Sequence, residues 1–365
     1  MIGRSCLVTR APLCEALAHG AHAWDSVLAR TAVASPFMTW AWHRAWAEAA
    51  PPAELQACEA MVLCAPDGEW RAILPIARRR VRFRHMSVTA LTWAAGELGD
   101  PDHLDVLAAP DADLDEFVPV LETMPWDVLM LDNLAPEAPN AARLCAAVAR
   151  RGAAPRQRSA SSCPYLELPR SWEEYLSTLP ATRRQTLRRK ERNLHRDHVV
   201  TLTDYGPERL QEGWRWLTAL HERRWEGAAI FRDPRVERLH RTFARDMANS
   251  GQLWLTTLDL DGTPAAAWYG FAMRDTISFY QSGRDPGWEH KSVGRVLMGM
   301  MIRRAIEQGY RRFDFLRGEE PYKLQWTETR RSTRETVVFR PGWRSAPLRA
   351  LDWAAETRAS LRARA

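Results

Sequence analysis

The sequence is short of lysine, of paired cysteines and of long apolar runs. Three of its 51 basic residues are lysines, Lys190, Lys291 and Lys323, so the other 48 are arginines. The six cysteines form no CxxC pair, which predicts reduced and mostly buried thiols. No run of about 18 apolar residues occurs, and the N-terminus lacks the apolar core of a signal peptide. These absences predict a cytoplasmic protein without a transmembrane segment.

Several motifs of known chemistry are also missing. The sequence has no HExxH, no Cys/His cluster with metal-ligand spacing, no Walker loop and no GxGxxG. We therefore expect no metal cofactor. The arginines lack interleaved aromatic residues for base stacking, so nucleic acid is not the default partner. Because lysine is so scarce here, a retained lysine is slightly more often needed as a compact point charge.

What is present indicates a folded α/β (α+β) protein with a duplicated layout. The chain of 365 residues is long enough for two domains, and its 46% hydrophobic content is that of a globular protein. Each half contains a Trp-rich helix, a hairpin with an Asp-Gly turn and a later apolar strand. In the first half these are 37–50, Asp67-Gly68 and 126–134, and in the second 210–226, Asp261-Gly262 and 311–318. Two copies of one fold is the simplest interpretation, and chance similarity is the alternative.

Composition also suggests where the domains meet. The segment 151–164 is polar, small and basic, which favours a join. We predict a first domain at 1–160, a second at 161–345 and a C-terminal helical tail at 346–365. The segment 181–198 is strongly basic, and is either a solvated helix face or a surface for an anionic acceptor.

One predicted helix start has the features of a phosphate site. We expect a strand at 277–283 and a helix from Ser292 to Gln308, with Ser292 as the N-cap. Gly294 allows close backbone approach, while Lys291 and Arg295 add positive charge. The corresponding helix of the first half opens with the acidic PDADLDEF (110–117), which would repel a phosphate. A plain capped helix is the alternative at 292, but the asymmetry favours an anion site.

Several motifs together resemble the GNAT superfamily. They are SPFMTWAW, YLELPRSWEEYLSTL, LHERRW, LDLDGTPAAA, GRDPGWEHKSVGRVLM and FDFLRGEEPYKLQW, in this order over about residues 35–330. More specifically, the chain resembles FemAB-like, CelD-type acetyltransferases of cellulose and exopolysaccharide biosynthesis. The family usually has proline where this chain has Val293, while Gly294 is kept. The resemblance implies two tandem GNAT-like domains, each a mixed twisted sheet flanked by helices. It places the acyl-CoA site in the second domain and leaves the first degenerate.

The resemblance and the residues together give a set of candidate site positions. Acetyl-CoA, or another acyl-CoA, is expected at Gln281, Lys291, Ser292, Val293, Gly294, Arg295 and Val296. A backbone N–H of the strand near 279–283 would polarise the thioester. The turn in FDFLRGEEPYK (313–323) supplies the remaining groups: Glu319 or Glu320 as base, Tyr322 as acid for the leaving thiolate, and Lys323. Arg317, Arg184 and Arg188 would bind an anionic acceptor.

Each of these residues also has a structural reading. Glu319 and Glu320 can be merely solvated, Tyr322 can be packing, Asp314 can bond a neighbouring backbone, and His221 in LHERRW is more readily structural.

The leading hypothesis is an acyl-CoA-dependent N- or O-acyltransferase of a cell-envelope or exopolysaccharide saccharide or precursor, which would work beside the exopolysaccharide-synthesis machinery. The alternatives are a FemAB-type aminoacyl transferase that uses aminoacyl-tRNA, and a non-catalytic ligand-binding protein.

Overall fold

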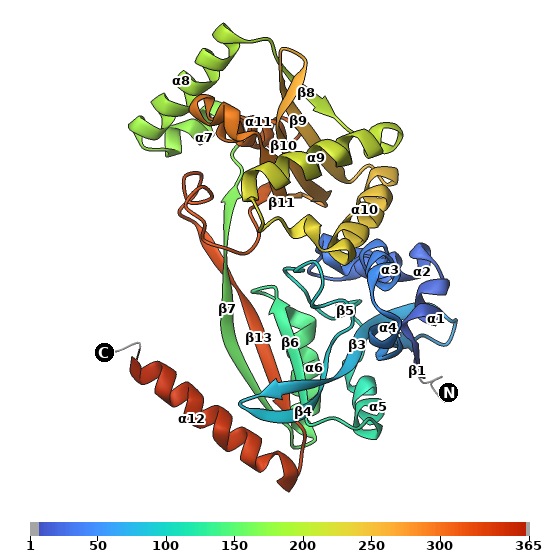
Figure 1. Cartoon of the computed structure of the whole chain (residues 1–365). Coiled ribbons are helices and arrows are strands. Elements are labelled where there is room, and N and C mark those ends of the chain that lie inside the picture. Colours follow the sequence, from blue (N-terminus) through green and yellow to red (C-terminus); the bar gives the residue numbers. More distant parts are fainter. Residues whose placement is uncertain (1–6, 363–365) are drawn as a thin grey trace. The chain divides into compact units, whose positions relative to one another are not determined.

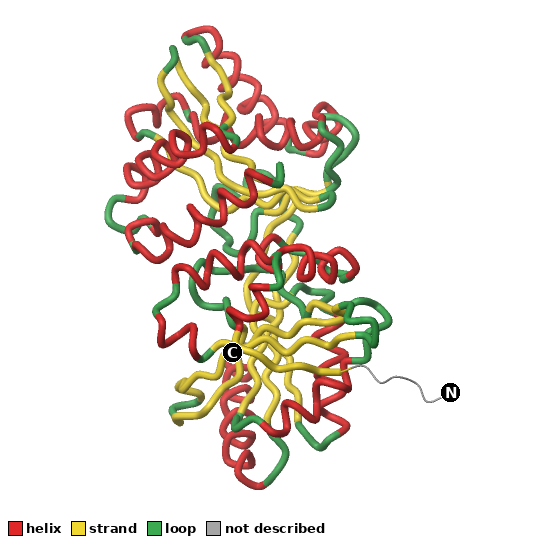
Figure 2. The backbone as a smooth tube through the Cα atoms, turned by 90° about the vertical axis from the view of Figure 1, so that its right-hand side faces the viewer, coloured by secondary structure: helices red, strands yellow, loops and turns green. Residues whose placement is uncertain are grey.

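The computed structural model describes residues 7–362, which divide into two compact units (Figures 1 and 2). The described part of unit 1 is 7–161 and 332–362, and unit 2 is 162–331. The sequence predicted a boundary near 160 and a separate tail from 346. By their contacts, however, residues 332–345 lie in unit 1 together with that helix. None of the helices formed by the described residues is both long and apolar enough to cross a bilayer.

The sheet of unit 2 is mixed. The hairpin of β9 and β10 is antiparallel, β10 pairs antiparallel with β11, and β11 pairs in parallel with β12. Antiparallel strands β8 and β7 complete the two sides. The strand order is therefore β8 (Val200–Asp204), β9 (Leu253–Leu260), β10 (Thr263–Met273), β11 (Thr276–Arg284), β12 (Arg312–Asp314), β7 (Ala154–Glu167).

Unit 1 repeats this arrangement strand for strand. Its fourth and fifth strands in the order, β4 and β6, again form a parallel pair, and its last strand, β13, is antiparallel to β6. The short β5 (Leu107–Ala108) lies off this path beside β3. The order is β1 (Leu7–Pro12), β2 (Cys58–Cys64), β3 (Trp70–Phe83), β4 (Met86–Trp93), β6 (Val128–Leu134), β13 (Arg330–Phe339). The prediction of two similar α/β domains, each with a mixed sheet, is confirmed.

Helices cover both faces of the sheet in unit 2. On one face α9 (Leu210–Trp225) and α10 (Pro234–Asn249) pack against the sheet, with Trp214 beside Tyr269 and Phe243 beside Phe271 at ring-centroid distances of 5.7 and 4.8 Å. On the other, α11 (Val293–Glu307) shares a core with Trp268 of β10. Outside α11 lie α7 (Trp172–Thr178) and α8 (Ala181–Asp197), and Arg303 of α11 pairs with Glu191 of α8 at 2.9 Å.

Unit 1 has a Trp-rich core and a docked C-terminal helix. Trp24, Trp42 and Trp46 are fully buried. In α12, Asp352 is fully buried and pairs with Arg84 at 2.9 Å, so this predicted tail is held against the unit. The helices of the unit are α1 (Leu13–Ala18), α2 (Ala21–Arg30), α3 (Trp40–Ala49), α4 (Pro52–Gln56), α5 (Phe117–Thr123), α6 (Pro139–Arg150) and α12 (Ala346–Arg362).

Two predicted elements differ from the structure. The expected join at 151–164 lies largely within strand β7, whose residues as far as 162 are exposed or half-buried and are small or polar, so its sequence carries little hydrophobic signal. The strand expected over 311–318 ends at Asp314, because the Asp314 carboxylate accepts a hydrogen bond from the Leu316 N–H at 2.8 Å and Leu316 has a left-handed φ of 57°. The strand therefore ends four residues earlier than the expected range.

Candidate acyl-transfer site

The site begins where β11 and β12 separate. The two strands pair from Thr276↔Arg312 to Ser278↔Asp314, and then β12 ends while β11 continues to Arg284 along β10. A register shift opposite Tyr269 inserts one extra residue into β11 at this point. Beyond Ser278, β11 thus has β10 on one side only. The opening leaves main-chain groups of β11 available on the side that β12 has left.

A glycine and a histidine hold this end of β11 against α9. A Cβ on Gly283 would meet the backbone nitrogen of His221 at 2.3 Å, so a side chain there cannot be accommodated. The buried His221 Nδ1 lies 3.0 Å from the Ser282 carbonyl oxygen. Burial lowers the pKa of His221, so the ring is neutral near pH 7 and its Nδ1–H donates to that carbonyl. His221 therefore acts structurally, as the sequence suggested.

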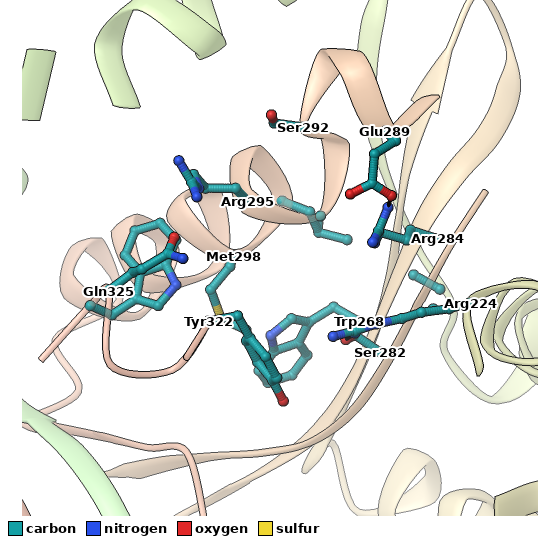
Figure 3. A pocket seen from close by; sticks show the side chains of 15 residues that line it. Arg224, Trp268, Ser282, Arg284, Glu289, Ser292, Arg295, Met298, Tyr322 and Gln325 are labelled. Carbon is teal, nitrogen blue, oxygen red and sulfur yellow. Dashed lines mark hydrogen bonds and ion pairs between the residues drawn. The ribbon is translucent and has the colours of Figure 1, made fainter. Parts of the chain in front are cut away.

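A cavity of about 200 Å³ lies in this opening (Figure 3). The start of α11 contributes Ser292, Gly294 and Arg295, β10 and β11 contribute Trp268, Ser282 and Arg284, and α9 contributes Arg224. The turn after β12 closes the cavity with Tyr322, Gln325 and Trp326. Elements that are far apart in the sequence thus together form the wall of one cavity.

The start of α11 has the geometry of an anion site. Ser292 occupies the N-cap position but adopts a left-handed φ of 60°, and its side chain caps no helix N–H. Its carbonyl instead accepts from the N–H groups of Arg295 and Val296 at 3.0 and 3.1 Å. The first-turn N–H groups of Val293 and Gly294 have no intrahelical acceptor, and a Cβ on Gly294 would lie 3.4 Å from Arg284 Cδ. The glycine keeps the approach to these amides open.

Charge in the cavity is positive. Its wall carries three guanidinium groups, Arg224, Arg284 and Arg295, and one carboxylate, Glu289. Glu289 forms an ion pair with Arg284, which lowers the pKa of the carboxyl group. Three cations against one anion leave a net charge of +2, which suits a pyrophosphate or another anionic ligand.

Tyr322 places a phenol on the wall of the cavity. Its ring lies beside Arg224, whose Cζ is 5.0 Å from the ring centroid, and it faces the cavity near Trp268 (Figure 3). Burial, and then the charge of Glu320, raise the pKa of Tyr322 above its ordinary value, with Arg224 opposing them in part. The phenol therefore keeps its proton at neutral pH and can donate it.

The other charged residues of the 317–323 turn are paired with one another or with neighbours. Lys323 is 5% exposed, and its Nζ donates to the Arg317 carbonyl and lies 3.0 Å from Glu320 Oε2. Glu319 pairs with Arg330 at 2.9 Å. Neither Glu319, Glu320, Lys323 nor Arg317 lines the cavity. Within the 317–323 turn, Tyr322 is the residue that lines the cavity, and the charge of Glu320 raises the pKa of Tyr322.

The remaining predicted residues lie around the cavity or away from it. Val293 and Val296 are buried in the core, so only their backbone groups are relevant to a ligand. Lys291 pairs with Asp197 of α8 at 2.7 Å, and neither Lys291 nor Gln281 lines the cavity. On the basic helix, Arg184 donates to the Leu176 carbonyl and Arg188 pairs with Glu173, both outside the cavity.

Sequence reasoning missed Arg224, Arg284 and Trp268. Arg224 stands in LHERRW, one residue before Trp225, and donates to Ser282 Oγ. The motif was visible, but only the fold shows that its arginine, rather than its histidine, reaches the cavity. Asp314 proved structural, since its buried carboxylate accepts from Leu316 and pairs with Arg331.

Comparison with known proteins identifies the domain that carries this cavity. Residues 181–324, from α8 to the 317–323 turn, match the family described as "Acetyltransferase (GNAT) domain". Unit 2 thus matches a GNAT acetyltransferase domain over these residues, and the enzyme class is acyltransferase. A comparison with curated protein sequences found no match.

Solved structures share the fold over most of the chain. A protein of unknown function from Bacteroides thetaiotaomicron VPI-5482 has a TM-score of 0.56 at 13% identity and covers 88% of this chain and 98% of its own. FemX has a TM-score of 0.57 at 10% identity, with 91% and 98% covered. L-PGS from Bacillus licheniformis has a TM-score of 0.54 at 13% identity, with 95% and 96% covered. At these identities the likeness concerns the fold alone.

Proposed function

We propose that the protein is an acyl-CoA-dependent N- or O-acyltransferase whose site is the cavity between α11, β11 and Tyr322. The observation that carries the proposal is the meeting of three features in one cavity: helix N–H groups beside Gly294, an unpaired strand end, and a neutral phenol. A thioester donor with a pyrophosphate requires an anion site, a carbonyl-polarising group and a proton source. Acetyl-CoA or a related acyl-CoA meets this description, and no metal is invoked.

The proposed reaction assigns a role to each group. A backbone N–H at the end of β11 polarises the thioester carbonyl while the acceptor nitrogen or oxygen bonds to the acyl carbon. The C–S bond breaks, and Tyr322 gives its proton to the departing thiolate. The acceptor gives its proton to solvent, because neither Glu319 nor Glu320, the bases expected from the sequence, lines the cavity. The proton then returns from solvent to Tyr322.

For the acceptor we propose a saccharide or saccharide precursor of the cell envelope or of an exopolysaccharide. The support is the motif resemblance to CelD-type proteins together with the excess of arginine around the cavity. On this proposal the protein works in the cytoplasm beside exopolysaccharide-synthesis machinery.

A second candidate is aminoacyl transfer from aminoacyl-tRNA, as the FemAB-type resemblance suggests. The observations that favour it are the fold likeness to FemX and the exposed arginines of α8. A non-catalytic ligand-binding role is the third.

The test is turnover with separate donors. Purified protein would be titrated with acetyl-CoA and with aminoacyl-tRNA by calorimetry, and release of free CoA thiol would be followed with a panel of amino sugars and nucleotide sugars. We expect acetyl-CoA to bind and thiol release to depend on a saccharide. Binding of charged tRNA without CoA binding would favour the second candidate, and CoA binding without any turnover would favour the third.

A further inference from the structure

A second cavity lies beside the first in unit 2, on the side of α8. It has a volume of about 270 Å³, and its wall includes Thr182, Arg183 and Thr186 of α8, Arg295 of α11, and Gln325 and Trp326. Arg295, Gln325 and Trp326 line both cavities, so the two cavities are neighbours at these residues. Neither Arg184 nor Arg188, the candidates taken from the sequence of this helix, lines it.

The wall of this cavity consists largely of hydrogen-bond donors and contains no carboxylate. Two guanidinium groups, Arg183 and Arg295, come from different helices, and two threonine hydroxyls come from α8. The Arg295 guanidinium forms no ion pair within the described residues. Arg183 has two distant partners. Its guanidinium donates to the Leu324 carbonyl at 3.5 Å and lies 4.0 Å from Glu328, whose side chain is 82% exposed, so this ion pair is weak.

The rest of α8 does not neutralise the cavity. Residues 181–197 carry seven Lys and Arg side chains and two carboxylates, which leaves a net charge of +5. The two carboxylates are already engaged: Glu191 with Arg303 at 2.9 Å and Asp197 with Lys291 at 2.7 Å. A polyanion in the cavity would therefore meet uncompensated positive charge on two sides.

We propose that the α8 cavity binds a phosphoryl group carried by one of the two substrates of the acyl transfer. A phosphoryl group offers several acceptor oxygens, which matches two guanidinium groups with hydroxyl donors beside them. The group is either a phosphate of the acyl-CoA donor or the phosphate of a phosphorylated saccharide acceptor. The inference rests on the proposed function, because it takes the neighbouring cavity as the place of acyl transfer.

The experiment compares Arg183→Gln with Arg189→Gln by titration calorimetry. Arg189 is exposed on the same helix and lines neither cavity, so it controls for the loss of one positive charge. Four probes are used: CoA, dephospho-CoA, which lacks the 3′-phosphate, UDP-N-acetylglucosamine as a phosphorylated saccharide, and inorganic pyrophosphate. We expect Arg183→Gln to weaken at least one phosphorylated probe about tenfold, the effect of one lost hydrogen bond to a charged group. Arg189→Gln should stay within about twofold of the wild type.

The pattern identifies the source of the phosphoryl group. A loss for CoA but not for dephospho-CoA assigns the cavity to the 3′-phosphate, and an equal loss for both assigns it to the pyrophosphate. A loss confined to UDP-N-acetylglucosamine assigns it to the acceptor. If Arg183→Gln binds all four probes as the wild type does, the inference is wrong even though CoA binds. If the wild type binds no CoA, the proposed function fails, and the UDP-N-acetylglucosamine and pyrophosphate arms still decide what the α8 cavity binds.

Discussion

At the scale of single residues, two neighbours in the 317–323 turn, Tyr322 and Lys323, have different surroundings. Lys323 is one of three lysines in the chain, and its ammonium group is buried inside the turn with Glu320 and the Arg317 carbonyl. Tyr322, its neighbour, faces the cavity instead. The scarcity of lysine did mark a constrained position, but the constraint that the structure displays is the closure of the turn.

Replacing Tyr322 by phenylalanine should lower kcat about 100-fold or more, because a positioned proton donor contributes about 10²–10⁴-fold. The ring packing remains, so the melting temperature and the KM for acetyl-CoA should change little. Tyr310→Phe is the matched control, since Tyr310 packs against the same core and does not line the cavity. Steady-state kinetics would measure the fall in kcat. Equal kcat values in Tyr322→Phe and the wild type would exclude the phenol from the mechanism.

Lys323→Met should destabilise the protein by about 1–2 kcal/mol, because the Arg317 carbonyl loses its donor and the half-exposed Glu320 loses its partner. Urea unfolding measures this, with Lys190→Met as a surface control that should be nearly neutral. A Lys323→Met protein with wild-type stability but little activity would contradict the structural role and return Lys323 to the reaction.

At the scale of elements, the anion site depends on how α11 begins. The 3₁₀ turn η5 (Pro286–Lys291) leads into Ser292, which has a left-handed backbone. Its side chain makes no cap hydrogen bond, so the first helix amides have no side-chain cap. An N-cap serine would ordinarily satisfy one of these amides. Here no side chain accepts from these amides, and a phosphate of a ligand could accept their hydrogen bonds instead.

Gly294→Asp should abolish stabilisation by CoA, since it places a carboxylate beside these amides and beside Arg284. Ligand stabilisation follows RT ln(1 + [L]/Kd), so the thermal shift seen with excess CoA should vanish. Gly206→Asp is the control, because a side chain there meets no atom within 4 Å and lies outside the cavity. An unchanged CoA shift in Gly294→Asp would place the phosphate site elsewhere.

At the scale of the whole molecule, the two units share a strand order but differ in chemistry at corresponding positions. In unit 1 the helical segment between the parallel strands begins with the 3₁₀ turn η2 (Leu114–Glu116), which leads into α5. The Asp113 side chain caps η2. Asp115 and Glu116 lie in that first turn, where unit 2 has Gly294 and Arg295. Negative charge stabilises such a helix start but repels a phosphate.

The chain should therefore bind one CoA, not two. Calorimetry should give a stoichiometry of one for the wild type and none for Gly294→Asp. A stoichiometry of two in the wild type would show that unit 1 also holds the ligand.

Stability should fall as the pH drops from about 7 toward 5. Burial lowers the pKa of His43 to about 4 and that of His240 to about 3, so the unfolded chain takes up protons below about pH 6.5 that the folded chain does not. Asp105, whose pKa burial raises to about 6, acts in the opposite direction and offsets part of the loss. Urea unfolding at several pH values would show the slope, and His240→Phe should reduce it; a slope unchanged in that variant would exclude His240 as a cause.

The sequence by itself determined the local elements and their repetition. Periodicity and Asp-Gly turns located both hairpin turns, and they placed the Trp-rich helices and α11 to within about three residues, because these signals depend on near neighbours in the chain. Gly294 and Tyr322 were also predictable as cavity residues, the first from helix-start chemistry and the second from motif resemblance.

Only the tertiary structure decided the rest. Residues 154–162 of strand β7 are small or polar, and the strand forms because two strands remote in sequence, β13 and β12, offer it backbone edges. The same holds for the site. Arg224 of α9 reaches the cavity because Gly283 lets α9 approach β11, and Arg183 and Arg295 line one cavity from two different helices. Whether a charge is free or paired, as with Lys323 and Glu320, is set by contacts in space, and composition and spacing along the chain do not contain that information.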